Sequence, residues 1–95
     1  MEQQEAYEKD VNIKLKKWKA KIDELKAEMD KADAKNRESL YTELERLREM
    51  QRKAQEKLES LKQSGEDSFD DMKRGVENAV KDLEEAVGSA FSRFK

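Results

Sequence analysis

The sequence predicts an all-α protein that forms coiled coils, and three observations lead to this fold class. The 95 residues include no proline, 46% of them are charged, and only 35% are hydrophobic. Ordinary globular domains have about 25% charged and about 45–50% apolar residues, and so polar a composition can also indicate disorder. Here, however, the apolar residues recur at steps of three and four, which is the pattern of long amphipathic helices.

The N-terminal two thirds of the chain carry this pattern as a seam of heptads. After an opening step of four, alternating steps of three and four connect Val11, Leu15, Trp18, Ile22, Leu25, Met29 and Ala32. Three consecutive steps of four then lead to Leu44, and such a stutter relaxes a supercoil without ending the helix. Regular heptads resume at Leu44, Leu47, Gln51, Ala54, Leu58 and Leu61. We therefore expect one long helix over about residues 5–63.

A turn is expected at residues 64–67, followed by a shorter helix over about residues 66–93. Gly65 can end the first helix, and Ser64 with Asp67 resembles a capping box for the second. The apolar stripe of the second helix has a period nearer 3.6 and is wider than the first. It consists of Phe69, Met72, Val76, Ala79, Val80, Leu83, Val87, Phe91 and Phe94.

Two architectures are compatible with a single helical domain over residues 1–95. In the preferred one, the two helices form a coiled-coil hairpin, and a second copy of the chain covers the rest of the long seam, so that the protein is a homo-oligomer. In the alternative, a further break near residues 33–36 gives a three-helix bundle. Asn36 is the only plausible cap there, and its neighbours are good helix formers. The missing helix breaker favours the hairpin.

One amphipathic helix cannot bury its own stripe, so each stripe must pack against another helix. We expect the interface to be formed by large apolar residues of both helices. On the long helix these are Trp18, Ile22, Leu25, Leu44, Leu47, Leu58 and Leu61, and on the short one Phe69, Met72, Val76, Leu83 and Phe91.

Residues for catalysis are missing from the sequence. There is no His and no Cys, and the glycines stand singly at Gly65, Gly75 and Gly88. We therefore expect no enzymatic activity, no cofactor and no metal site. The net charge of −2 argues against nucleic-acid binding. No apolar run approaches the roughly 20 residues of a membrane span, and no signal peptide is recognisable, so a cytoplasmic location is expected.

One concentrated basic run stands out: Lys14, Lys16, Lys17, Lys19 and Lys21, with no acid between Val11 and Ile22. On a helix, Lys14, Lys17 and Lys21 flank one side of the apolar stripe. Their side chains can extend toward an anionic membrane surface. The preferred interpretation is that lysine stems cover the coiled-coil seam, opposite acids of a partner helix.

The segment from residue 58 to 83 resembles a known family. The matching residues are Leu58-Glu59-Ser60-Leu61-Lys62, Ser64-Gly65-Glu66 and Phe69-x-x-Met72-Lys73-x-Gly75-Val76-Glu77-x-Ala79. They resemble small coiled-coil proteins of cyanobacteria and proteobacteria that are described as stress-responsive. Phe69 stands where these proteins commonly have Trp, and Val80 where they have a second aromatic residue. The resemblance implies a bacterial, stress-linked context and no catalytic residues.

From the sequence we therefore expect a non-enzymatic coiled-coil protein that acts by self-association or by docking a partner protein. A second hypothesis is peripheral binding to a membrane surface through Lys14–Lys21 and the helix over 66–94. A third is a holdase-like chaperone that exposes its stripe when the hairpin opens.

Overall fold

The computed structural model describes residues 2–31 and 34–94, and these residues are almost entirely helical. The helices are α1 (Glu2–Asp30), α2 (Ala34–Gln63) and α3 (Phe69–Phe94), with a short 3-10 helix, η1 (Glu66–Ser68), directly before α3. No strand occurs within the described ranges. The all-α fold class predicted from the sequence is therefore confirmed.

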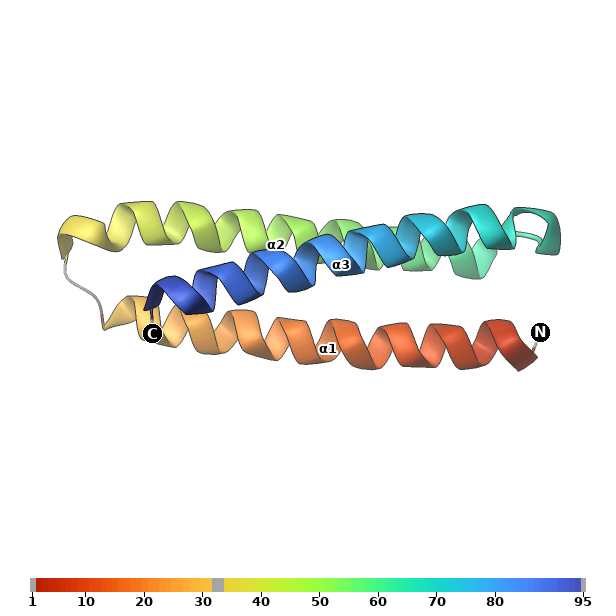
Figure 1. Ribbon diagram of the computed structural model, residues 1–95, viewed down its shortest axis with the longest axis horizontal. Helices are drawn as coiled ribbons and strands as arrows, with labels where there is room; N and C mark the ends of the chain where they lie inside the picture. Colours follow the sequence, from red (N-terminus) through yellow and green to blue (C-terminus); the bar gives the residue numbers. More distant parts are fainter. Residues whose placement is uncertain (1, 32–33, 95) are drawn as a thin grey trace.

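The three helices lie side by side in an elongated bundle (Figure 1). Its Cα atoms extend over 51 × 17 × 17 Å, which agrees with the roughly 45 Å of a 30-residue helix at 1.5 Å per residue. The rings of Tyr7 and Phe69 meet 6.1 Å apart where α1 and α3 begin. At the other end, Arg93 of α3 donates to Glu43 of α2 over 3.2 Å. Helices α1 and α3 are thus parallel, and α2 runs opposite to both.

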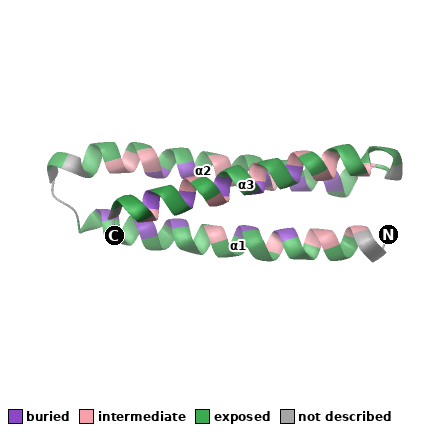
Figure 2. Cartoon of the chain, viewed as in Figure 1, coloured by how far each residue is buried: buried purple, intermediate pink, exposed green. Residues whose placement is uncertain are grey.

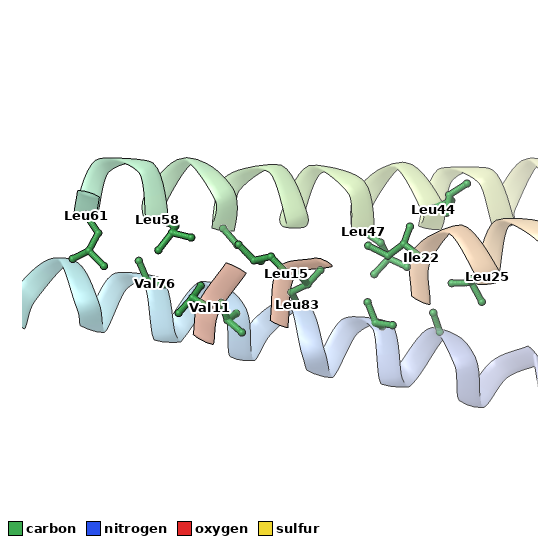
Figure 3. Packing of buried hydrophobic residues seen from close by; sticks show 14 of the residues in the cluster. Val11, Leu15, Ile22, Leu25, Leu44, Leu47, Leu58, Leu61, Val76 and Leu83 are labelled. Atoms are coloured by element: carbon green, nitrogen blue, oxygen red, sulfur yellow. The ribbon is translucent and has the colours of Figure 1, made fainter. Parts of the chain in front are cut away.

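A continuous apolar core fills the space between the helices. Figure 2 shows the buried positions as a stripe on the inner side of each helix, and Figure 3 shows their side chains interdigitating. The buried cluster consists of Val11, Leu15, Ile22, Leu25 and Met29 of α1; Leu44, Leu47, Ala54, Leu58 and Leu61 of α2; and Val76, Val80, Leu83, Val87 and Ala90 of α3. Each helix therefore covers the stripes of the other two.

The prediction of one long helix over residues 5–63 is wrong. The alternative, a three-helix bundle, describes the chain. Helix α1 ends at Asp30, and α2 begins at Ala34 and packs against it. The break expected near 33–36 falls partly outside the described residues, because 32 and 33 are not among them. The physical reason lies in tertiary packing. When the chain folds back, the apolar stripe of α1 is buried against the other helices, and the free energy of this burial outweighs the local preference for continuing the helix.

The end of α1 is held to α2 through Asp30. The hydroxyl of Tyr41 and the ammonium of Lys26 both donate to its carboxylate, the latter over 3.3 Å. The hydrogen bond from Tyr41, and then that from Lys26, lower the pKa of Asp30 below its ordinary value. A carboxylate at a helix C-terminus faces the negative end of the helix dipole. These two donors offset that repulsion.

At the connection between α2 and α3, Ser64 stabilises the end of α2 instead of capping the next helix. Its backbone N–H and its hydroxyl both donate to the carbonyl of Leu61, over 3.1 and 2.7 Å. Gln4 of α1 reaches the same carbonyl over 3.4 Å. Gly65 does not have a positive φ, so α2 ends without a left-handed glycine. The prediction that Ser64 and Asp67 form a capping box for the next helix is therefore wrong for Ser64.

The beginning of α1 is held to α3 through Tyr7. Its hydroxyl donates to the carbonyl of Lys73 over 3.3 Å, and the ammonium of Lys73 lies 5.1 Å from the centre of its ring. Burial of the tyrosine, and secondly the carboxylate of Glu77, raise the pKa of the Tyr7 hydroxyl to about 12. Tyr7 and Tyr41 thus hold opposite ends of α1 against the other two helices.

The two isoleucines of α1 provide a matched test of this packing. Ile22 is 1% exposed and Ile13 is 65% exposed. We expect Ile22→Ala to lower the free energy of unfolding by about 2–5 kcal/mol, because it leaves a cavity in the core. Ile13→Ala should change it by less than about 0.5 kcal/mol. Urea unfolding followed by circular dichroism measures both, and equal effects would contradict the assigned orientation of α1.

The Asp30–Tyr41 contact predicts a pH-dependent contribution to stability. Since the pKa of Asp30 is lowered in the folded chain, its contribution is present above the unfolded pKa of about 3.9 and is lost as pH falls through the folded value. Tyr41→Phe should destabilise the bundle at neutral pH, and the difference from the wild type should shrink in acid. Thermal unfolding of both proteins across this range measures it. A difference that stays constant with pH would contradict the role of Asp30.

Candidate functional site

The outward side of α1 carries an apolar residue that the bundle does not use. Among the described residues, Ile13 is the only large hydrophobic residue that is strongly exposed, at 65%. It lies between the buried residues Val11 and Leu15 in sequence, but on the opposite side of the helix. Ala20, one heptad further along, is exposed on the same side. This side of α1 therefore presents a narrow apolar strip to solvent.

Lysines surround this strip. Lys16 and Lys17 lie on either side of Ile13 and Ala20, and both are exposed. Lys14 and Lys21 lie on the edge toward α3, and Lys19 on the edge toward α2. We call this surface the lysine face of α1, and it consists of Ile13, Lys14, Lys16, Lys17, Lys19, Ala20 and Lys21.

No carboxylate of the described residues lies within ion-pair distance of the five lysines of this face. Some basic residues elsewhere on the surface do have such partners, although others, such as Lys53 and Lys57, have none among the described residues. On α2, Arg52 pairs with Glu49 and Glu56, and Arg48 reaches Asp23 of α1 over 3.5 Å. The lysine face is thus a patch of uncompensated positive charge on a chain of net charge −2.

Two of the lysines also contact aromatic rings at the edge of the face. The ammonium of Lys21 lies 5.7 Å from the centre of the Phe91 ring of α3, and that of Lys17 lies 5.4 Å from the Trp18 ring. Lys14 lines a shallow groove between α1 and α3 together with Glu77 and Glu84. The aliphatic parts of Lys14 and Lys21 therefore cover the contact between α1 and α3, while all five lysines of the face remain exposed.

Acidic residues limit the lysine face at both of its ends. Asp10 precedes it, and Asp23 and Glu24 follow it; all three are exposed. The Asp23 carboxylate is oriented toward α2 by its pairing with Arg48. The positive potential is therefore confined to the middle of α1, where side chains of one sign reinforce each other over distances shorter than the screening length of about 8–10 Å.

The residues proposed from the sequence for helix packing all lie in or against the core. Eight are buried: Ile22, Leu25, Leu44, Leu47, Leu58, Leu61, Val76 and Leu83. The other four are partly buried and pack against that cluster: Trp18, Phe69, Met72 and Phe91. Their partners are the other helices of the same chain, so they form no open binding surface. The indole Nε1 of Trp18 is shielded from solvent and has no hydrogen-bond partner.

Sequence reasoning missed Ile13 and the two tyrosines. Ile13 could have been found, because it stands off the heptad seam between two seam residues and must therefore point outward. Tyr7 and Tyr41 could not be found in this way, since their partners Lys73 and Asp30 are brought to them only by the fold.

Within the ranges the structure describes, no group of three or more acidic side chains is placed to hold a metal ion. In the same ranges, none of the helices combines the length and the apolar character needed to cross a bilayer. Comparison of the chain with family models, with curated protein sequences and with solved structures gave no match.

Because no described carboxylate pairs with a lysine of the lysine face, removing the charges of this face should not weaken the bundle. We expect the variant with Lys14→Gln, Lys16→Gln and Lys17→Gln to unfold at the same urea concentration as the wild type or slightly above it. Neutral residues relieve repulsion between like charges on one helix, which amounts to a few tenths of a kcal/mol per pair. A clear loss of stability would show that these lysines serve the fold.

Proposed function

We propose that this protein is a non-enzymatic docking protein, and that the lysine face of α1 is the surface that binds an anionic partner. The observation that carries the proposal is the group of five exposed lysines around an exposed isoleucine, none of them paired with a carboxylate that the structure describes. The fold places them on a rigid helix whose opposite side is anchored in the core. A surface built on such an element keeps its geometry on binding.

The electrostatics of α1 support this role. Like charges placed three and four residues apart on a helix repel each other and destabilise it slightly. Among the described residues the five lysines make no compensating ion pair, whereas Lys62, Arg48 and Arg52 on α2 do. A concentrated patch of one sign steers oppositely charged partners and speeds their association. The arrangement therefore suits an external anionic partner better than internal stabilisation.

Self-association through the heptad seam is the weaker proposal. The stripes of all three helices are covered within one chain, so a second copy could reach them only if the bundle opened. The same holds for a holdase that binds unfolded clients through these stripes. Docking through the lysine face requires no opening, and for this reason we prefer it. The stress-linked bacterial context and the cytoplasmic location stay predictions from the sequence.

Retention on an immobilised polyanion tests the proposal. At pH 7 a chain of net charge −2 should be retained on heparin at low salt only through a local basic patch. We expect the wild type to be retained. The face variant, with Lys14→Gln, Lys16→Gln and Lys17→Gln, should elute at clearly lower salt, since each lost contact removes a salt-dependent contribution.

A second triple variant serves as the matched control. Lys35→Gln, Lys53→Gln and Lys57→Gln remove the same amount of charge from exposed lysines of α2, and this control variant should elute like the wild type. If the wild type passes unretained, or if both variants weaken equally, the lysine face is not the binding surface. Sedimentation equilibrium of the wild type should then be used to examine self-association.

A further inference from the structure

We infer that the partner of the lysine face is the anionic surface of a lipid bilayer, with α1 lying flat on it and Ile13 entering the headgroup layer. This inference rests on the proposed function and specifies its partner. Clusters of four to eight basic residues on an amphipathic helix are the usual signature of binding to anionic lipids. The lysine face has five basic residues, and its exposed isoleucine lies among them.

The residue types on this face fit a bilayer better than a protein. Protein interfaces are depleted of Lys and enriched in Arg and aromatic residues, which supply their anchoring contacts. The lysine face offers only Lys, one isoleucine and one alanine. The one aromatic residue in this segment, Trp18, is partly buried and packs against the core. A long flexible ammonium suits a fluid layer of headgroups, because it needs no fixed geometry.

The same composition argues against a nucleic-acid partner. Sequence reading and tight phosphate contacts rely on the fork of Arg, and binding of single strands relies on exposed aromatic rings for stacking. Neither is present on the lysine face. The whole chain is in addition negatively charged.

The shape of the bundle agrees with a planar partner. The grooves around α1 lie toward the other helices, such as the groove of about 240 Å³ lined by Tyr7, Val11 and Glu77. Helix α1 runs straight along one edge of the bundle (Figure 1), and Ile13 and Ala20 on its outward side are exposed. A convex helix can rest on a flat bilayer, whereas a bound peptide would require a groove.

The positions of the exposed acids define the orientation. The outward sides of three packed helices point in three different directions, so the acids on the outside of α3, such as Asp70, Asp71 and Glu85, face away from a bilayer that contacts α1. Asp10 and Glu24 lie at the two ends of the lysine face. Contact is therefore expected in the middle of α1 and not along its whole length.

Co-sedimentation with vesicles tests this inference. The probes are vesicles of phosphatidylcholine alone and of phosphatidylcholine mixed equally with phosphatidylglycerol. We expect the wild type to pellet with the anionic vesicles at low salt and to be released at high salt. One lysine near an anionic surface strengthens binding about fivefold, so the face variant should bind about a hundredfold more weakly. The control variant should bind like the wild type.

Ile13→Ala separates insertion from charge attraction. Because Ile13 is exposed, this substitution leaves the core intact, and urea unfolding of the same sample verifies it. We expect binding to anionic vesicles to fall roughly tenfold, since much of the apolar side chain no longer enters the headgroup layer. Retention on heparin should not change, because heparin offers no apolar layer.

The outcomes distinguish the two proposals. Retention on heparin without binding to anionic vesicles overturns the lipid inference and leaves the docking function standing. If the wild type neither binds heparin nor binds anionic vesicles, the lipid inference and the docking function are both overturned. Equal binding of the wild type and the face variant to vesicles, or tighter binding of the wild type to duplex DNA than to vesicles at the same salt, also overturns the lipid inference.

Discussion

Three narrow apolar stripes on a highly charged chain must cover one another, and this requirement determines the rest of the structure. Each helix contributes only a short series of core residues, so any two of them would leave part of the stripes in water. With α3 packed against both α1 and α2, residues such as Ile22, Leu58 and Leu83 are all fully buried. Burial on this scale contributes about 1.5–3 kcal/mol per large side chain. Every other feature, including the orientation of the lysine face, follows from which side of α1 is used for this purpose.

Much of this fold could be predicted from sequence periodicity, because periodicity reports which side of a helix is apolar. It identified helical structure throughout and the stripe of α3. It left the break between Asp30 and Ala34 as the less favoured alternative, because no glycine or proline marks it and the surrounding residues favour a helix. The interactions that favour the break form only when α1 and α2 pack against each other, as in the Tyr41–Asp30 hydrogen bond. The role of Ser64 was misassigned for a related reason: a serine between two helices can serve either one, and only the geometry decides.

The candidate site shows the same division between pattern and geometry. The lysine run is evident in the sequence, and Lys14, Lys17 and Lys21 were expected to lie together on one side of the stripe. The structure adds two facts that a helical wheel does not contain. Lys14 and Lys21 line the edge toward α3, with Lys21 near Phe91, while Lys17 and Lys16 lie on either side of Ile13 on the outward face. In addition, the ionic partners expected for such a run are not supplied by the neighbouring helices, although Glu77 and Glu84 lie across the groove from Lys14. The concentration of exposed lysines around the exposed Ile13, without a paired carboxylate among the described residues, makes the surface a candidate.

The positions of the aromatic residues have a practical consequence for studying this chain. The sequence has two tyrosines and one tryptophan. Tyr7 lies near the beginning of α1, Tyr41 contacts the end of α1, and Trp18 lies between these two positions. Ultraviolet absorbance of the two phenols therefore reports on both ends of the bundle together, and fluorescence of the indole reports on its middle. Fraying of the ends could thus be distinguished from cooperative melting without attaching any label.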